Sequence, residues 1–381
     1  MDCYLDNSAT TRPGAGVVRE MSDCMLEGYY NPSALYAPAV QVEKRLTACR
    51  ELIASKLHAD AKRVVFTSGG TEADNLAILS LLSDRRGGRV LFTAGEHPAV
   101  REPCEYLKGH GFDVREIPYD AAGLVRLDAL EELLTPDTRL ICVMQVNNET
   151  GAVMPLREIA ALRDRLCPQA LLHVDGVQGF LRLPVDLRAL GIDSYALSGH
   201  KIHGPKGVGA LATGERVRLT PRMLGGGQEK NLRSGTENVP GIVGLMQAIA
   251  DYPAQNDMRA LKLRLLGRLR EIAGENFFVN GPAPESESAA PHILNCSLAP
   301  VRSETMIYAL EADHVYVAAG SACSSRKQKL STVLTAMQTP RRVAESALRF
   351  SLSPYTTAEE IDYAADCIRK HYELLKRYER R

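Results

Sequence analysis

Three groups of residues that could do chemistry each follow a short apolar run that reads as a buried β-strand. They are the small-residue segment 68–71 (Ser-Gly-Gly-Thr), the acid Asp175 and the base Lys201. A charged side chain at the tip of a buried strand is costly without a partner. Small residues at the start of a helix let backbone N–H groups approach an anion. Each group also has a plain structural explanation: Thr71 and Asp175 as helix caps, and Lys201 as a side chain that reaches solvent.

One cofactor uses all three groups. Pyridoxal phosphate needs a lysine for its Schiff base, an acid against its pyridine nitrogen and a cradle for its phosphate. Ligands of parallel sheets collect at the carboxyl ends of strands, where Asp175 and Lys201 are expected as neighbours. Segment 68–71 is not followed by Gly-Lys-Ser/Thr, and no Gly-x-Gly-x-x-Gly follows a strand. His200 and His203 suggest a metal pair, but no third ligand has suitable spacing.

Nine stretches spread from end to end carry a resemblance to one family. They are LDNSATT (5–11), FTSGGTEADN (66–75), EHPAV (96–100), VNNETG (146–151), HVDGVQ (173–178), SGHKIHGPKGVGAL (198–211), GGGQEKNLRSGTENV (225–239), GSACSS (320–325) and RFSLSPYTT (349–357). In this order they resemble the cysteine desulfurases of the NifS/IscS type, in the class V aminotransferase group of fold-type I pyridoxal-phosphate enzymes.

The resemblance implies roles for individual residues. The cofactor would be held by Lys201 (Schiff base), Asp175 (pyridine nitrogen), Gln178 (phenolic oxygen), His97 (stacked on the ring), Gly70, Thr71, Ser198 and His200 (phosphate), Asn148, and Thr236 (phosphate of the partner subunit). The substrate carboxylate would be held by Asn31, Asn148 and Arg349, since a guanidinium fork suits a carboxylate. Without the resemblance, His97 reads as a packed loop histidine, Arg349 as a surface ion pair and Asn148 as a turn former.

Cys323 is the residue that separates this chemistry from simple transamination. It lies among small residues, Gly-Ser-Ala-Cys-Ser-Ser, which suit a loop that swings a thiol into and out of a site. The resemblance implies Lys201, Cys323 and His97 as the catalytic residues. Lys201 would move the α-proton of L-cysteine, and the Cys323 thiolate would take its sulfur as a persulfide while alanine leaves. No resident metal is implied, although Cys323 could transiently ligate an iron–sulfur cluster.

The resemblance also implies a homodimer and a sulfur-acceptor protein, either an iron–sulfur scaffold or a tRNA-thiolation enzyme, with no direct nucleic-acid or membrane partner. Two other interpretations stay open. One keeps the fold but changes the reaction to that of a selenocysteine lyase or another class V lyase or transaminase. The other is a protein that keeps the fold for assembly only. Intact Lys201, Asp175, His97 and Cys323 argue against the latter.

The segment after Cys323 departs from the family's pattern. Arg326, Lys327 and Lys329 follow it within six residues, where relatives often carry an acid-Pro pair at 329–330. These cations would favour the thiolate and could steer an acidic acceptor. A solvated charged loop is the plain alternative, as a solvated terminal helix is for the basic segment 368–381.

Strand and helix patterns alternate through the first two thirds of the chain, which is typical of a largely parallel sheet covered on both faces. Together with this pattern, the resemblance implies an α/β fold of the fold-type I transferase kind, with a mainly parallel sheet of seven-stranded type in a large domain and a smaller α+β C-terminal domain. The expected helices are 43–57 and 71–82, and the expected strands are 63–67, 89–93, 112–117, 139–146, 170–175 and 194–198.

The pattern changes after about residue 250. The segments expected there are a helix over 258–273, an exposed loop over 280–291, strands over 293–298 and 314–319, and a capping box from Thr357 to Glu360 that opens a last helix. We therefore expect an N-terminal arm (1–14) that packs with the small domain, a large cofactor-binding domain (15–250) and a small domain (251–381) that carries Cys323.

Composition limits the class of protein. Among 381 residues, 46 are Lys or Arg and 46 are Asp or Glu, and this balance disfavours a general polyanion binder. No apolar run approaches the ~18 residues that span a bilayer. The first residues carry acids and no apolar core, so we expect a cytoplasmic protein without a signal peptide. The nine cysteines include no Cys-x-x-Cys, so most are expected to be reduced and packed as small hydrophobes.

Overall fold

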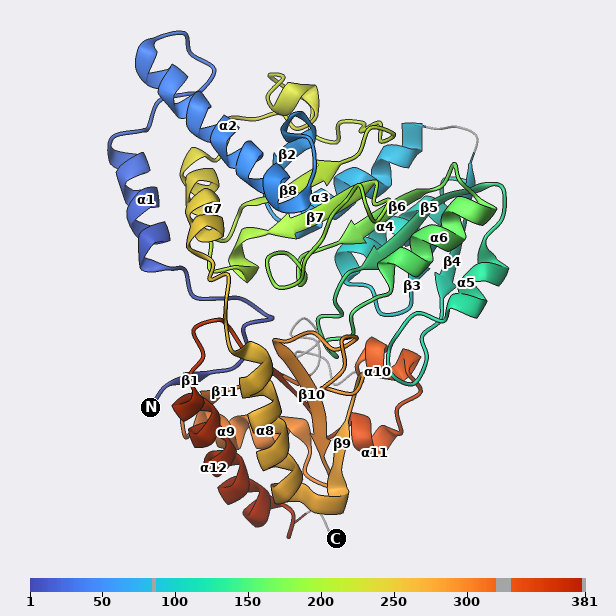
Figure 1. Cartoon of the computed structure of the whole chain (residues 1–381), viewed down its shortest axis with the longest axis vertical. Helices are drawn as coiled ribbons and strands as arrows, with labels where there is room; N and C mark the ends of the chain where they lie inside the picture. The colour runs from blue at the N-terminus through green and yellow to red at the C-terminus, as the bar shows by residue number, and fades with distance from the viewer. Residues whose placement is uncertain (84–86, 320–329, 379–381) are drawn as a thin grey trace.

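The computed structural model describes residues 1–83, 87–319 and 330–378 (Figure 1). Its largest sheet has the strand order β2-β8-β7-β6-β5-β3-β4. Neighbouring strands are parallel, except that β8 is antiparallel to both β2 and β7. The bounds are β2 (Val64–Thr67), β3 (Gly88–Thr93), β4 (Phe112–Ile117), β5 (Thr138–Met144), β6 (Leu171–Asp175), β7 (Ser194–Ser198) and β8 (Gly209–Thr213).

The mainly parallel seven-stranded sheet confirms the α/β fold class. Every strand expected before residue 200 forms, with its ends shifted by two residues at most. Strand β8 was not expected, because its sequence Gly-Ala-Leu-Ala-Thr is poor in the β-branched and aromatic residues typical of strands. Its five residues are all buried between two other strands, so burial outweighs that weak propensity.

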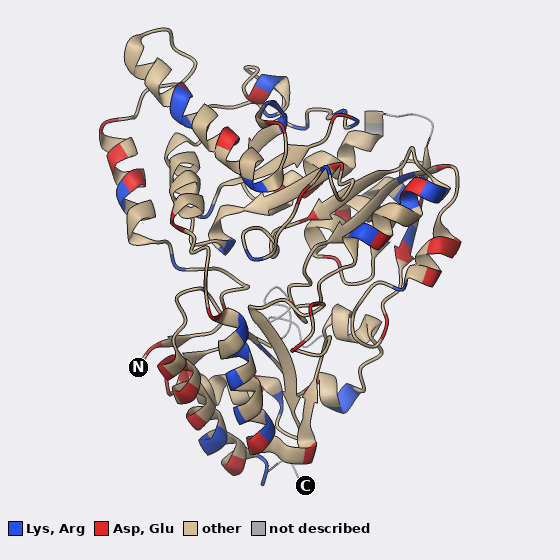
Figure 2. Ribbon diagram, viewed as in Figure 1, with Lys and Arg blue, Asp and Glu red and all other residues tan. Residues whose placement is uncertain are grey.

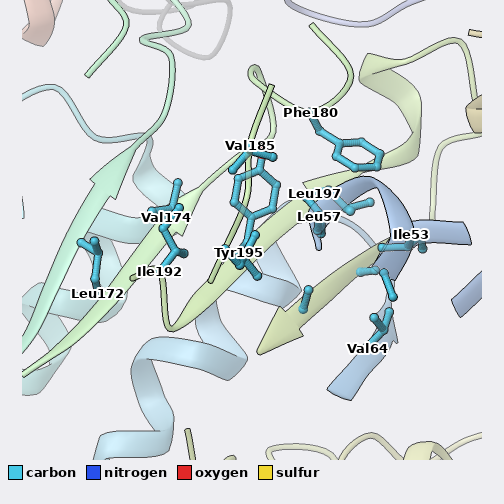
Figure 3. Packing of buried hydrophobic residues seen from close by; sticks show 14 of the residues in the cluster. Ile53, Leu57, Val64, Leu172, Val174, Phe180, Val185, Ile192, Tyr195 and Leu197 are labelled. Atoms are coloured by element: carbon cyan, nitrogen blue, oxygen red, sulfur yellow. The ribbon is translucent and has the colours of Figure 1, made fainter. Parts of the chain in front are cut away.

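Helices cover both faces of this sheet, as the alternation of strand residues requires. In β5, Ile141 and Val143 join the core on one face, which includes residues of α2, α6 and α7. Leu140 and Cys142 join the core beneath α3 and α4 on the other. Figure 3 shows part of the first core, around Tyr195. The helices are α1 (Ala15–Leu26), α2 (Ala37–Leu57), α3 (Gly70–Leu79), α4 (Pro98–Lys108), α5 (Leu127–Leu133), α6 (Leu156–Leu166) and α7 (Val239–Asp251).

A second core lies in the lower half of Figure 1, around the antiparallel sheet β12-β10-β9. The N-terminal residues Cys3 and Leu5 belong to it. Figure 2 shows basic residues of α8 beside acidic residues of α12, where Arg264 and Arg268 pair with Asp362. The elements are β1 (Cys3–Tyr4), α8 (Met258–Ala273), β9 (Phe277–Val279), β10 (Ile293–Leu298), α9 (Ser303–Glu311), β11 (Val315–Tyr316), α10 (Thr332–Ala336), α11 (Arg341–Ala344), β12 (Ala347–Ser351) and α12 (Ala358–Leu375).

Two expectations for this second region are wrong in part. Segment 280–291 has no helix or strand, but Asn280 and Ala290 are buried. The Asn280 amide donates to Ser297 Oγ at 2.8 Å, and Ala290 N–H donates to the Gly151 carbonyl, so the loop packs between the two cores. The strand expected over 314–319 is only Val315–Tyr316. Helix 258–273, strand 293–298 and the Thr357–Glu360 capping box are confirmed.

The cysteines behave as expected where they are described: eight of them are free and buried. Within the described ranges, no helix is both long and apolar enough to span a membrane. We propose to keep the division into an arm (1–14), a large domain (15–250) and a small domain (251–381), since one core draws mainly on each of the last two segments.

Candidate active site

The N-terminal arm connects the second core to the carboxyl ends of the large sheet's strands. Asn7 N–H donates to the Ser351 carbonyl in β12, and Thr11 N–H donates to the carbonyl of His200, next to Lys201. In Figure 1 this arm, in dark blue, crosses between the two parts of the molecule. Backbone groups of the arm therefore face the strand ends where the chemistry is expected.

Asp175 and Lys201 lie at one edge of the sheet because their strands are parallel neighbours. Asp175 is the last residue of β6 and pairs with Ala196 of β7. Lys201 ends the short 3₁₀ turn Gly199–Lys201 directly after β7. Asp175 Oδ1 accepts a hydrogen bond from Val177 N–H at 2.9 Å. This hydrogen bond stabilises the turn that follows β6. Burial raises the pKa of the Asp175 carboxyl group.

The Lys201 amine is turned toward the arm. Nζ donates to the carbonyls of Ser8 at 2.6 Å and Ala9 at 2.8 Å. Burial, followed by the positive charges of Arg349 and Arg182, lowers the pKa of Lys201 to about 8. With this pKa, an appreciable fraction of the amine is neutral near pH 8.

His97 caps α4 and is fixed by that role. Its Nδ1 accepts from Ala99 N–H at 3.1 Å, and burial lowers the pKa of the ring. A neutral imidazole that accepts at Nδ1 carries its proton on Nε2. Asp175 and Lys201 both act on the charge of His97, which places the three side chains in one electrostatic cluster.

The segment 68–71 forms the N-terminus of α3. Gly69 precedes the helix at φ 152°, a conformation that side chains rarely adopt. A Cβ on Gly70 would lie 2.6 Å from Val177 Cγ2 and 3.8 Å from Ser198 Cβ, so only glycine lets these three backbones approach. Gly69 is the helix cap, so the alternative that Thr71 is the cap is wrong, and the Thr71 side chain is exposed.

Gln178 and His200 line the same edge of the sheet. Gln178 Nε2 donates to the Ser8 carbonyl at 2.9 Å, while its buried Oε1 has no hydrogen-bond partner among the described residues. His200 Nδ1 lies 3.1 Å from Thr10 Oγ1. Burial and then the charge of Lys201 lower the pKa of His200 to about 4, so its ring is neutral.

Arg349 forms an ion pair, as expected for it without the resemblance, but its side chain is buried and not on the surface. Nη2 donates to Asp6 Oδ1 at 2.7 Å, and Nη1 donates to the Asn148 carbonyl at 2.9 Å. Its Nε has no partner among the described residues. The turn of VNNETG is formed by the side chain of Asn147, whose Oδ1 accepts from the N–H groups of Glu149 and Thr150, rather than by Asn148.

Two expected site residues, Asn31 and Thr236, do not join this cluster in the described part of the chain. Asn31 is exposed on the loop between α1 and α2, where it accepts from Ser33 N–H. Thr236 is exposed on the loop before α7. Cys323 lies outside the described residues, with Arg326, Lys327 and Lys329. Asp6, Ser8 and Arg182 were missed: the first two lie in the LDNSATT stretch, and Arg182 follows HVDGVQ by four residues.

The cluster suits pyridoxal phosphate by the chemistry of its groups. It contains the carboxyl group of Asp175, the Lys201 amine with its lowered pKa, and the side-chain oxygen of Gln178, which has no hydrogen-bond partner among the described residues. The N-terminus of α3, where Gly70 allows close packing, lies beside them. Among the described residues no group of three or more His, Cys, Asp or Glu side chains could hold a metal ion.

Comparison with known proteins points the same way. The family model "Aminotransferase class-V" matches residues 3–364. A cysteine desulfurase IscS of Dictyoglomus turgidum is 35% identical over 98% of this chain and 95% of its own, and one of Salmonella arizonae is 39% identical over 96% and 92%. Among solved structures, a NifS-like protein has a TM-score of 0.89 at 33% identity over 98% of this chain and 100% of its own. SspA in complex with cysteine has a TM-score of 0.81 at 31% identity over 93% and 100%.

Proposed function

The chain belongs to the class-V aminotransferase family and is a cysteine desulfurase of the NifS/IscS type, and we propose that the cluster around Lys201 is its active site. The observation that carries this proposal is the position of Lys201 and Asp175 on adjacent strand ends. The lysine amine is held there with a pKa of about 8.

Pyridoxal phosphate, which the family generally uses, supplies an electrophilic aldehyde and an electron-accepting ring when bound. The reactive part of the cofactor would be held by Lys201 at the aldehyde, Asp175 at the ring nitrogen, Gln178 at the ring oxygen and His97 at the ring face, with Asn148 nearby. Its phosphate would be held by Gly70, Thr71, Ser198 and His200. The buried, unpartnered Gln178 Oε1 and the glycine-lined start of α3 support this assignment.

The chain's own residues then divide the work on L-cysteine. Arg349 holds the substrate carboxylate, together with Asn148. Lys201, as a neutral amine, accepts the α-proton and hands it on. The Cys323 thiolate attacks the substrate sulfur: the carbon–sulfur bond breaks, a sulfur–sulfur bond forms, and the carbon product takes up a proton. L-Cysteine and the Cys323 thiol thus become L-alanine and the Cys323 persulfide, with no further reactant.

A second copy of the chain would complete the site. The segment from α1 through the start of α2 exposes a group of large apolar side chains, with Leu26 76% and Leu35 96% exposed. Solvent-exposed apolar surface of this extent is typical of an interface. Asn31 lies in the middle of that segment, so the homodimer that covers it would bury Asn31. The resemblance implies that the same homodimer brings the exposed Thr236 to the partner's cofactor phosphate. The exposed apolar residues are Val18, Met25, Leu26, Tyr29, Leu35, Tyr36 and Val40.

The dimer has a direct test in mixed chains. A Lys201→Ala chain keeps Thr236, and a Thr236→Ala chain keeps Lys201, so their heterodimer should have one site with both residues. We expect that site to bind cofactor with nearly normal affinity. Binding no better than in the Thr236→Ala homodimer would refute supply of Thr236 across the interface.

The reaction itself is tested by incubation with L-cysteine. We expect alanine in the solution and one additional sulfur atom on the peptide that contains Cys323, measured by mass spectrometry. We propose that this sulfur passes to an acceptor protein for iron–sulfur assembly or tRNA thiolation, in the cytoplasm. Alanine without sulfur on Cys323 would place the nucleophile elsewhere, and activity restricted to selenocysteine would favour the lyase alternative.

A further inference from the structure

Arg182 connects the backbones of two residues of the proposed site. Its Nη1 donates to the Gln178 carbonyl at 3.2 Å, and its Nη2 donates to the Lys201 carbonyl. Gln178 follows β6 and Lys201 follows β7, so one guanidinium joins the two strand-end segments that carry the acid and the amine. A planar fork with several donors is well suited to such a bridge.

The bridge is made by a cation that has no carboxylate partner among the described residues. The two groups to which it donates are carbonyls, and the polar side chain beside it is the phenol of Tyr252, which stays neutral because burial raises its pKa. Burial lowers the pKa of Arg182 because its charge is withdrawn from water, while the Tyr252 and Tyr195 hydroxyls act in the opposite direction. A buried cation without a countercharge is unfavourable, so a role confined to holding two carbonyls would be met at lower cost by a neutral donor.

We propose that Arg182 is a positioning residue, which fixes the Gln178 and Lys201 backbones relative to each other and, as a permanent cation, keeps the Lys201 amine neutral. This inference rests on the proposed function, in which Lys201 acts as a neutral amine. Arginine suits the second task because it stays protonated at every pH at which lysine titrates.

The charges around Lys201 agree with this role. Burial is the largest factor that lowers the pKa of Lys201, and the positive charges of Arg349 and then Arg182 lower it further. Asp175 and Asp6 act in the opposite direction. His97 and His200 add little charge, because burial lowers the pKa of both rings. Removal of Arg182 would leave Arg349 alone against two carboxyl groups, and the amine would hold its proton to higher pH.

The test uses the protein without cofactor. Lysines are acetylated briefly at a series of pH values around 8, and the extent at Lys201 is read by peptide mass spectrometry. In Arg182→Gln we expect the midpoint of reactivity to rise, so that reactivity at pH 8 falls roughly two- to fivefold. Arg182→Lys keeps the charge and should keep the midpoint. Arg218→Gln, which removes an exposed arginine, is the matched control.

The affinity for pyridoxal phosphate tests the second part of the proposal, that Arg182 fixes the Gln178 and Lys201 backbones relative to each other. Lysine cannot present the fork, so Arg182→Lys should bind pyridoxal phosphate several-fold more weakly at an unchanged midpoint. An unchanged midpoint in Arg182→Gln, or an equal shift in Arg218→Gln, would overturn the electrostatic role, and normal cofactor affinity in Arg182→Lys would overturn the bridge. Arg182→Met replaces the Gln variant should that one fail to fold. If the cofactor proved to be bound elsewhere, the midpoint of Lys201 would still be measured, so the two failures are distinguishable.

Discussion

The cofactor side and the sulfur side of this active site are built in different ways. Lys201 and Gln178 follow strand ends of the large sheet and are hydrogen-bonded to backbone carbonyls of the arm within one chain. Asn31 and Thr236 are exposed, and Cys323 lies outside the described residues. The difference teaches that one chain by itself brings Lys201 and Gln178 together, whereas Thr236 and Asn31 would reach the site only through the proposed homodimer, and sulfur transfer depends on the proposed role of Cys323.

Described residues on both flanks of segment 320–329 are nevertheless fixed beside the substrate residues. Ala318 and Arg349 exchange backbone hydrogen bonds, at 3.2 and 2.7 Å. Ser331 Oγ donates to Glu149 Oε2 at 2.5 Å, next to Asn148 in the chain. Ala318 and Ser331 therefore both lie next to residues proposed to hold the substrate carboxylate. Single substitutions should be able to stop sulfur transfer without affecting cofactor binding.

The largest effect is expected from loss of the amine on the cofactor side. Lys201→Ala should lower turnover by at least roughly 10³-fold, since it removes both the covalent attachment point and the proton acceptor. Borohydride reduction followed by peptide mapping checks the attachment, and Lys206→Ala, at an exposed neighbouring lysine, is the control. A fixed cofactor on a peptide with Lys206 in the Lys201→Ala protein would contradict the assignment.

The sulfur side should fail without disturbing the cofactor side. In Cys323→Ser we expect normal cofactor binding and a normal spectral change on addition of L-cysteine, because Lys201 and Asp175 remain. Alanine release should stop, since a hydroxyl cannot take up the sulfur. Cys367→Ser changes the least buried of the described cysteines and serves as the control. Alanine and persulfide at the normal rate in Cys323→Ser would move the nucleophile to another cysteine.

Between the two sides lies Arg349, where a smaller effect is expected. Arg349→Lys keeps a charge beside Asp6 but loses the fork, so the KM for L-cysteine should rise by about 10- to 100-fold, in line with ~1.5–3 kcal/mol for hydrogen bonds to a charged group. The cofactor spectrum should not change. The same substitution at the exposed Arg342 is the control. A fall in kcat at constant KM would assign carboxylate binding to other residues.

The sequence predicts the positions of Asp175 and Lys201 well because those positions depend on local pattern. Apolar runs place the strands, and the residues that end them, Asp175 and Lys201, follow from strand order alone. Contacts made by backbone atoms leave no such pattern: nothing in the residue types at Ser8 and Ala9 indicates that their carbonyls accept from a lysine more than 190 positions away. Arg182 gives no signal in the sequence for the same reason, since the two groups that it bridges are backbone carbonyls.

The proposed roles of Asn31, Thr236 and Arg349 could be predicted only through the resemblance. Asn31 and Thr236 lie on exposed loops, where residue type and spacing give no physical reason to assign them to the proposed site. Arg349 looked like a surface ion pair, because its burial comes from the pairing of β12 with β10 and from Asp6 of the arm, which lies far from it in sequence. Tertiary contacts of this kind have no local signal.

The smallest effect is expected from the basic residues after Cys323, and it tests the sulfur side at its outermost point. Changing Arg326, Lys327 and Lys329 together to Gln should leave turnover with a small reductant within roughly threefold, because exposed charges contribute about 1 kcal/mol or less. Transfer to a protein acceptor should fall further, and its dependence on salt should flatten. Steering acts over a distance that salt shortens to about 8–10 Å and below, whereas support of the thiolate persists with any acceptor. Equal losses in both assays at every salt concentration would show that the cations act on the thiol or the loop itself, and that no acidic docking surface is involved.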